Sequence, residues 1–205
     1  MTLFQEKSII LASSSPVRKQ ILQELGFNFQ TINPNFDEES AKDEIKHLEI
    51  PSQALFLAQQ KALSISKKYP ESIVIGSDQI CQINNKILSK SKNIDDARLQ
   101  LQELRGKTHF QNNAISIFQD SKEIFSNIEI AKIKMRALSS EEIENYLKID
   151  NPIGCAGSYK IERNARHLFK EISGDVNAIA GISIQSALNY LHQKNIICLN
   201  ANSKS

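Results

Sequence analysis

The sequence predicts a mixed α/β fold, in which helices alternate with strands and one long pair of strands is antiparallel. Short runs of β-branched and apolar residues alternate with stretches of helical periodicity. Residues 109–118 and 124–135 instead alternate with period two across a short Asp-Ser-Lys connection, which is typical of two paired strands. With 205 residues and 40% apolar content, the chain fits one large domain or two small lobes, and it contains no internal repeat or linker.

Composition excludes several classes of protein. Twenty-five basic and 23 acidic residues give a net charge of +2, too small to indicate a nucleic-acid binder. The four histidines show no metal-ligand spacing, and no apolar run approaches the ~20 residues that a membrane span needs. We therefore expect a cytoplasmic protein. Neither a disulfide framework nor a CxxC metal site is indicated by the three widely spaced cysteines, Cys81, Cys155 and Cys198.

The N-terminal elements are predicted to be a strand, a tight turn and a helix. Residues 8–13 form a short buried strand, a serine caps the helix, Pro16 occupies its first position and Gly26 ends it. Backbone N–H groups, hydroxyls and the cations Arg18 and Lys19 would converge there on an anion. An ordinary capped helix with solvated cations gives the same pattern, and without other support it is the more frequent case.

An acidic loop and a long helix come next. Residues 27–32 predict a strand, and residues 33–40 carry the acidic triplet 37–39, which suits a magnesium ion or is merely solvated. Pro51-Ser52 is expected to cap a helix from about residue 53 to 68. Lys61 lies within that helix, where a lysine is usually a surface residue.

The central stretch, residues 72–83, is the first candidate for chemistry. Ile73, Val74 and Ile75 suit a strand that is covered on both faces. Gly76 and Ser77 lack bulk, so another group could approach the backbone where Asp78 appears. On the strand alone, Asp78 is equally well explained as a functional carboxylate and as a turn or cap residue.

The remaining elements follow from turn and cap signals. Asn84-Asn85 predicts a hairpin over residues 79–90, and Asn93 caps a helix that extends through Leu104. Ser139 and Glu142 form a capping box for a helix to about residue 149. Later elements are a strand within 154–163 that carries Tyr159, Lys160 and Glu162 between small residues, a strand at 168–172, a helix at 184–194 and a strand at 196–199.

Six motifs together point to one family. They are LASSSPVR at 11–18, FDE at 36–38, QKA at 60–62, GSDQ at 76–79, GKTH at 106–109 and CAGSY at 155–159. In this order, from about Ile9 to Leu191, they resemble the Maf family of nucleoside triphosphate pyrophosphatases. The resemblance implies a single domain over residues 1–205, with an inosine triphosphatase-like mixed sheet flanked by helices and two lobes around a central nucleotide cleft. It also implies a homodimer and hydrolysis of the α–β phosphate bond with a divalent cation, Mg²⁺ or Mn²⁺.

The resemblance assigns roles to individual residues. Asp78 matches the proton acceptor, which would deprotonate the attacking water or hold it on the metal. Glu38 and Asp78 would be the metal ligands. Phosphate groups would be bound, and charge on the leaving pyrophosphate neutralised, by the polar and basic positions Ser13, Ser15, Arg18, Lys61 and Lys90.

Three further positions, Val17, Gln79 and Glu162, bear on the base. The branch acting on dTTP and UTP has threonine after the catalytic aspartate and a glutamine after the Ala-Gly motif, where this chain has Gln79 and Glu162. The pattern is similar to the 7-methyl-GTP branch, and a carboxylate at Glu162 would pair with a cationic methylated guanine. Val17 stands where the branches have arginine or tryptophan, which leaves the pyrimidine activity open.

Two points complete the expectation. Ser89 and Ser91 replace the glycine and the proline of the family's Gly-Lys-Pro motif, which predicts a more mobile loop around Lys90. A non-catalytic regulator of cell division, with the nucleotide site acting as a sensor, is a third hypothesis. The complete set of Asp78, Glu38, Lys61 and Arg18 argues against it.

Overall fold

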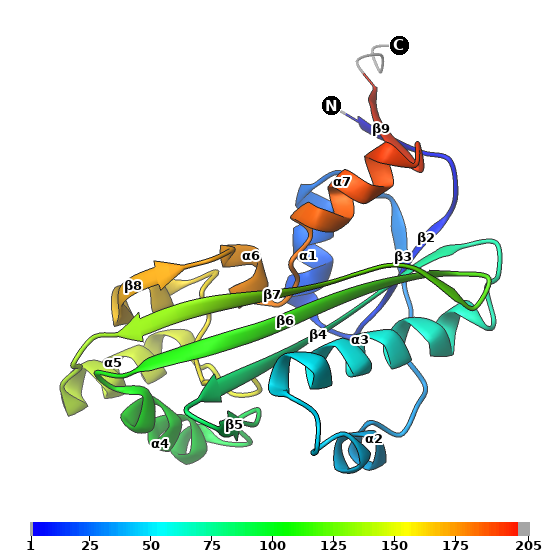
Figure 1. The fold of residues 1–205 in the computed structure, drawn as a ribbon. Coiled ribbons are helices and arrows are strands. Elements are labelled where there is room, and N and C mark those ends of the chain that lie inside the picture. Colours follow the sequence, from blue (N-terminus) through cyan, green and yellow to red (C-terminus); the bar gives the residue numbers. More distant parts are fainter. Residues whose placement is uncertain (1, 201–205) are drawn as a thin grey trace. The chain divides into compact units, whose positions relative to one another are not determined.

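The computed structural model describes residues 2–200 and has a mixed α/β fold, which confirms the predicted class. Its strands are β1 Thr2–Gln5, β2 Ile9–Ala12, β3 Phe29–Thr31, β4 Ile73–Ile83, β5 Lys86–Leu88, β6 Thr108–Gln119, β7 Lys122–Met135, β8 Phe169–Ser173 and β9 Ile197–Asn200. The helices are α1 Pro16–Glu24, α2 Glu38–Glu44, α3 Ile50–Ser66, α4 Ile94–Leu104, α5 Ser140–Asp150, α6 Val176–Ala180 and α7 Gln185–Gln193, with a 3₁₀ helix at Asn164–Leu168 (Figure 1). Within the described residues, no helix has the length and apolar character needed to cross a membrane.

The strands form one mixed sheet and one small ribbon. The strand order of the sheet is β3-β2-β4-β6-β7-β8, with β5 paired to β4. Strand β2 pairs in parallel with β3 and β4, whereas β5 and β8 pair antiparallel with their neighbours. Strands β1 and β9 form a separate antiparallel pair. Of these strands, only β1 lacks a counterpart among the sequence predictions.

The described chain divides into two compact units, each discontinuous in sequence. The first unit contains residues 2–78, 114–128 and 181–200, and the second contains residues 79–113 and 129–180. Strands β4, β6 and β7 contribute residues to both. The two-lobed cleft remains a prediction.

In the first unit, a glycine lets a helix lie directly against the sheet. Strands β2 and β4 are buried along their paired residues, and Ile10 and Val74 pack with Ala62 and Ile65 of α3. A Cβ at Gly76 would lie 2.3 Å from the carbonyl oxygen of Ala58 and 2.8 Å from the amide nitrogen of Ala62. The group that approaches the backbone at Gly76 is therefore α3 itself.

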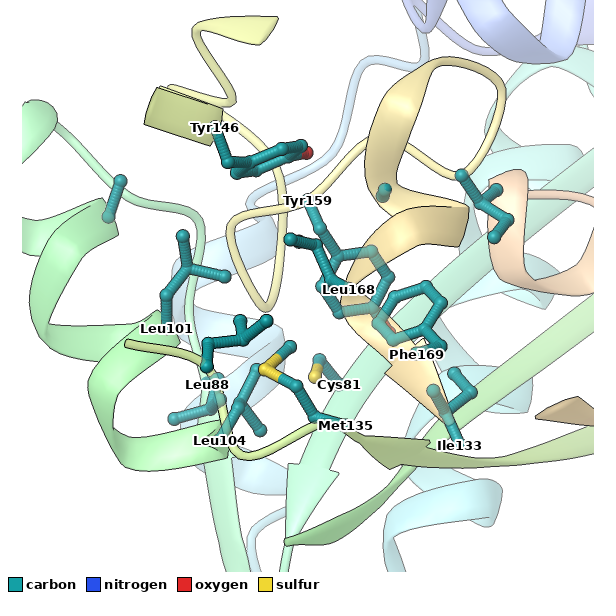
Figure 2. Close-up of a cluster of buried hydrophobic side chains, with 14 of the residues drawn as sticks. Cys81, Leu88, Leu101, Leu104, Ile133, Met135, Tyr146, Tyr159, Leu168 and Phe169 are labelled. Carbon is teal, nitrogen blue, oxygen red and sulfur yellow. The ribbon is translucent and has the colours of Figure 1, made fainter. Parts of the chain in front are cut away.

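The second unit has an apolar core of its own (Figure 2). Strands β4 and β5 contribute Cys81 and Leu88, and β7 contributes Ile133 and Met135. Helices α4 and α5 contact each other and add Leu101, Leu104, Tyr146 and Leu147 to this core. The apolar face of each of these helices is therefore buried within the unit, in the same cluster as residues of β4, β5 and β7.

A buried histidine lies beside this core. His109 of β6 is fully buried, and burial lowers its pKa from 6.5 to about 4.

Unfolded His109 takes up a proton near pH 6.5, so the free energy of unfolding falls as the pH drops from 6.5 toward 4. The expected loss is about 3 kcal/mol. Urea titrations across this range should show a shallower pH dependence for His109→Gln than for wild type. Equal slopes for wild type and His109→Gln would contradict this prediction.

Four local predictions were wrong. Asp78 does not end its strand, because β4 continues to Ile83. Ser52 does not cap α3, which begins at Ile50 with Glu49 as its N-cap. Residues 154–163 form turns, with a single bridge between Ala156 and Lys90, and no strand. Helix α2 begins within residues 33–40, which were expected to be a loop, and α6 lies where no element was predicted, because their five to seven residues are too few to show a periodic pattern.

Candidate active site

Two carboxylates meet one ammonium group in the first unit. Lys61 Nζ forms an ion pair with Asp78 Oδ1, and it lies 3.2 Å from Glu38 Oε2. The Lys61 and Asp78 side chains are only 9% and 11% exposed. A lysine buried to this extent is costly unless it is paired, so the usual expectation of a surface lysine is wrong here.

Local structure explains why these three groups meet. Lys61 precedes Ala62 on α3, so the close approach of α3 at Gly76 also brings Lys61 to Asp78, two residues further along β4. Asp37 caps α2 by accepting hydrogen bonds from the amide and the hydroxyl of Ser40. Glu38 is consequently fixed at the first position of that helix.

The charges of the lysines dominate the state of Glu38. Desolvation by burial raises its pKa, but the charge of Lys61 and the contact with Lys42, at 2.9 Å, outweigh this effect and lower the pKa to about 2. Glu38 is therefore ionised throughout the neutral range. It offers a carboxylate next to that of Asp78.

A second cluster lies around the turn before α1. Ser15 is the N-cap of α1, and its hydroxyl oxygen accepts from the amide of Arg18. Ser13 Oγ accepts from the amide of Ser15 at 3.1 Å and from the Arg18 guanidinium at 3.3 Å. Arg18 Nε also donates to the carbonyl oxygen of Gly181 at 2.7 Å, and Ser77 Oγ donates to the same oxygen at 3.1 Å.

This cluster joins the carboxylate pair electrostatically. Arg18 is buried, which lowers the pKa of its guanidinium, while Asp78 and Glu38 raise it. The structure thus brings together six of the residues singled out in the sequence: Ser13, Ser15, Arg18, Glu38, Lys61 and Asp78. Two hydroxyls and two cations beside a pair of carboxylates suit a polyphosphate and a nucleophilic water.

The other candidates are distributed differently. Val17 is half-buried on α1, in the first unit, while Gln79, Lys90 and Glu162 belong to the second unit. Lys90 and Glu162 are exposed, and the charges of both act on the thiol of Cys155, whose pKa is raised mainly by burial.

The loop around Lys90 is held by the bridge between Lys90 and Ala156 and by two hydrogen bonds of the next residue, Ser91. Ser91 is buried and its hydroxyl donates to the carbonyl oxygen of Pro152 at 3.3 Å. The amide of Gly154 donates in turn to the carbonyl oxygen of Ser91 at 2.9 Å. Ser91 thus anchors the backbone next to Lys90.

The donor set for a metal ion consists of Glu38 and Asp78. No group of three His, Cys, Asp or Glu side chains within residues 2–200 is placed to hold a metal. Two carboxylates fit Mg²⁺ nonetheless, because this ion commonly takes one or two protein carboxylates and completes its shell with water and substrate phosphate. Both carboxylates already converge on one cationic group, the ammonium of Lys61.

Comparison with known proteins identifies the family. The model of a family described as Maf-like protein matches residues 8–194. The chain belongs to the Maf-like protein family. A nucleoside triphosphate pyrophosphatase of Legionella pneumophila (strain Philadelphia 1) is 35% identical over 187 residues, which are 91% of this chain and 94% of that protein.

Other Maf-like relatives carry more specific names. A 7-methyl-GTP pyrophosphatase of Bartonella henselae is 36% identical, over 93% of this chain and 98% of the relative. A dTTP/UTP pyrophosphatase of Dictyoglomus thermophilum is 33% identical, over 91% of this chain and 97% of the relative. Identity at this level therefore separates the family from others but does not separate the two nucleotide preferences.

Gly181 and Gln111, which hold candidate residues in place, lie outside the six sequence motifs. The carbonyl oxygen of Gly181 anchors Arg18 across 163 positions, and no local pattern marks that contact. Gln111 and Tyr159 bond to each other, and Gln111 also accepts from Gln79. The polar residues within the β6 pattern, His109, Gln111 and Asn113, were the available signal, since buried strands rarely carry such side chains.

Proposed function

We propose that this Maf-like protein is a nucleoside triphosphate pyrophosphatase that converts 7-methyl-GTP to 7-methyl-GMP and pyrophosphate. The observation that carries the hydrolase activity is the buried cluster in which Lys61 pairs with both Asp78 and Glu38 beside Arg18. Its relatives bear the name nucleoside triphosphate pyrophosphatase at about 35% identity over most of the chain. The enzyme is a hydrolase of acid anhydrides.

The residues of the first unit supply the steps of the reaction. Asp78 accepts a proton from water, the resulting hydroxide attacks the α-phosphorus, and the bond from that phosphorus to the α–β bridging oxygen breaks. Pyrophosphate leaves with the bonding electron pair. Arg18 and Lys61 neutralise its developing charge, and the hydroxyls of Ser13 and Ser15 donate hydrogen bonds to phosphate oxygens. Lys90 is proposed as a further phosphate contact.

A divalent cation belongs to this proposal as Mg²⁺ or Mn²⁺. Glu38 and Asp78 would hold it, and when bound it supplies charge neutralisation at the phosphates and a more acidic water. Lys61 would then pair with phosphate instead of bridging the two carboxylates. Chelation of divalent cations should accordingly stop pyrophosphate release.

The substrate preference rests on the second unit. Glu162 is exposed and the charges of Glu162 and Lys90 act on the same thiol, so an anionic group and a cationic group lie in one region. Methylation at N7 gives guanine a positive charge, which a carboxylate at Glu162 would pair with while it accepts hydrogen bonds from the base. A neutral pyrimidine offers no such charge, and Val17 leaves the base without an aromatic partner at that position.

The deciding experiment measures pyrophosphate release from 7-methyl-GTP, GTP, UTP, dTTP and CTP with Mg²⁺ or Mn²⁺. We expect 7-methyl-GTP to have the highest kcat/KM. Glu162→Gln should lower that value about tenfold or more, while leaving UTP nearly unchanged, because a charge-assisted hydrogen bond contributes roughly 1.5–3 kcal/mol. Glu171→Gln, at an exposed glutamate of β8 in the same unit, is the matched control and should keep the wild-type preference.

Each other outcome has a defined meaning. Preference for UTP or dTTP would overturn the 7-methyl-GTP assignment and retain the hydrolase, as the sister branch would predict. Binding of nucleotides without cleavage would overturn the hydrolase and favour the regulator of cell division. The homodimer and the cytoplasmic location stay predictions, to be checked by analytical ultracentrifugation and by fractionation of cells.

A further inference from the structure

A chain of hydrogen bonds runs from Gln79 through the buried part of the second unit. Gln79 Nε2 lies 2.7 Å from the carbonyl oxygen of Ile179 and 3.0 Å from Gln111 Oε1. Gln111 Nε2 lies 2.8 Å from the hydroxyl of Tyr159, which is 2.9 Å from His109 Nε2. Gln111, Tyr159 and His109 are each no more than 5% exposed, so these polar groups depend on one another for hydrogen bonding.

Backbone carbonyl groups fix the direction of this chain. The oxygen of Ile179 can only accept, so the Gln79 atom beside it must be the amide nitrogen. The other N–H of that amide then donates to Gln111 Oε1. Gln111 Nε2 likewise faces the carbonyl oxygen of Ala156, at 3.4 Å, in addition to Tyr159. Neither amide can rotate by 180° without placing two oxygen atoms against each other.

The inner end of the chain is consistent with this direction. The Tyr159 oxygen accepts an N–H from Gln111 and lies 2.9 Å from His109 Nε2. A neutral imidazole can either accept the Tyr159 proton or donate its own, so Tyr159 and His109 are hydrogen-bonded in both tautomers. The Tyr159 ring is held by Phe169, with ring centroids 4.9 Å apart, as the contact of these rings in Figure 2 shows. The hydroxyl is therefore part of a packed core.

One atom of Gln79 remains for a ligand. Both N–H groups of its amide are used, which leaves the carbonyl oxygen, a hydrogen-bond acceptor, on a half-buried side chain. We propose that Gln111 and Tyr159 are positioning residues that lock the Gln79 amide, so that it presents only an acceptor to the N–H edge of the nucleotide base. This inference rests on the proposed function, because it assumes that Gln79 contacts the base.

The side-chain oxygen of Gln79 discriminates among bases because it disfavours those that face it with another acceptor. Guanine and 7-methylguanine carry adjacent N–H donors, which such an oxygen can engage. Uracil offers a single N–H, at N3, between two carbonyl oxygens, so an acceptor placed to meet two adjacent donors leaves a uracil carbonyl oxygen unpaired against it, and an unpaired buried polar group is costly. If the amide could turn over, it would offer N–H to that carbonyl oxygen, and discrimination would fall.

The test compares kcat/KM for 7-methyl-GTP and UTP in wild type, Gln111→Leu, Tyr159→Phe and Gln79→Leu. Gln111→Leu should reduce the ratio of the two values about five- to tenfold through KM, with kcat little changed. Tyr159→Phe, which keeps the ring, should reduce it less. In the Gln79→Leu background, Gln111→Leu should change the ratio no further, because Gln111 acts only through Gln79.

A matched control separates positioning from stability. Asn112 of β6 is buried and its side chain donates to Ile80 and Gln82 of β4. Asn112→Ala should lower the melting temperature as Gln111→Leu does, yet leave the ratio of kcat/KM values unchanged. An additive effect of Gln111→Leu and Gln79→Leu, or an unchanged ratio in Gln111→Leu, would overturn the proposal.

A second readout keeps this proposal distinct from the hydrolase. Calorimetric binding of 7-methyl-GMP and UMP by the same variants requires no turnover. If wild type binds both without cleaving triphosphates, the hydrolase fails, but Gln111→Leu should still shift the ratio of the two Kd values. If cleavage is normal and neither Gln79→Leu nor Gln111→Leu shifts either ratio, the hydrolase stands and the positioning role fails.

Discussion

Asp78→Asn should reduce pyrophosphate release by about a thousandfold or more, the scale expected when a positioned general base is removed. The amide cannot accept the proton of the attacking water. It also removes one of the two carboxylates that we propose as ligands of the divalent cation, so weaker binding of that cation is expected as well. Initial rates with saturating nucleotide and Mg²⁺ or Mn²⁺, measured on the purified variant, provide the check.

The matched control for this variant is Asp37→Asn. Asp37 is an exposed carboxylate next to Glu38, and asparagine caps a helix as well as aspartate does, so activity should persist. Circular dichroism of Asp78→Asn should show a folded protein. If Asp78→Asn fails to fold, or if it folds and retains more than about a tenth of the wild-type rate, Asp78 is a structural residue and not the proton acceptor.

Gly76→Ala should cost about 3 kcal/mol or more of unfolding free energy, at the upper end of overpacking substitutions. The new methyl group would meet backbone atoms of α3 at 2.3 Å and 2.8 Å, and backbone cannot move aside as a side chain can. Helix α3 would have to shift away from β4, which separates Lys61 from Asp78. Urea unfolding and the rate of pyrophosphate release should therefore both be affected.

A double substitution tests this explanation. The methyl group would also lie 2.9 Å from the Cβ of Ala62, so Ala62→Gly removes that one contact and leaves the two backbone contacts. Gly76→Ala combined with Ala62→Gly should accordingly remain as unstable as Gly76→Ala or become less stable. Recovery of stability in the double variant would mean that the side-chain contact, and not the helix backbone, limits residue 76.

Local signals in the sequence predicted most of the elements correctly. Ser15, Asn93 and the capping box of Ser139 and Glu142 begin their helices as expected, because a cap is formed by residues three positions apart. The hairpin of β4 and β5 turns at Asn84, which has a positive φ of 52°. Such features depend on short stretches of chain, so one sequence suffices to find them.

Contacts between segments far apart in the sequence could not be predicted from these local signals. The sequence around Lys61 indicates a surface residue, and only the packing of α3 on β4 brings Lys61 to Asp78. The hydrogen bond from Arg18 to Gly181 likewise joins two segments 163 positions apart. The small residues around Tyr159 predict a strand within 154–163, but tertiary packing holds this segment as turns. Motif resemblance selected the candidate site residues, whereas Gln111, which links Gln79 to Tyr159, lies in no motif.

The discontinuity of the first unit also bears on how the enzyme is made. Its residues come from three separate stretches, the last of which begins at Gly181. A ribosome must therefore synthesise nearly the whole chain before Arg18 finds its carbonyl partner. Closing such long loops is entropically slow, so the parallel strands at the N-terminus have to wait for their remaining neighbours. A nascent chain released before residue 181 would carry Asp78, Lys61 and Glu38 without the segment that anchors Arg18, and should be poorly folded and inactive.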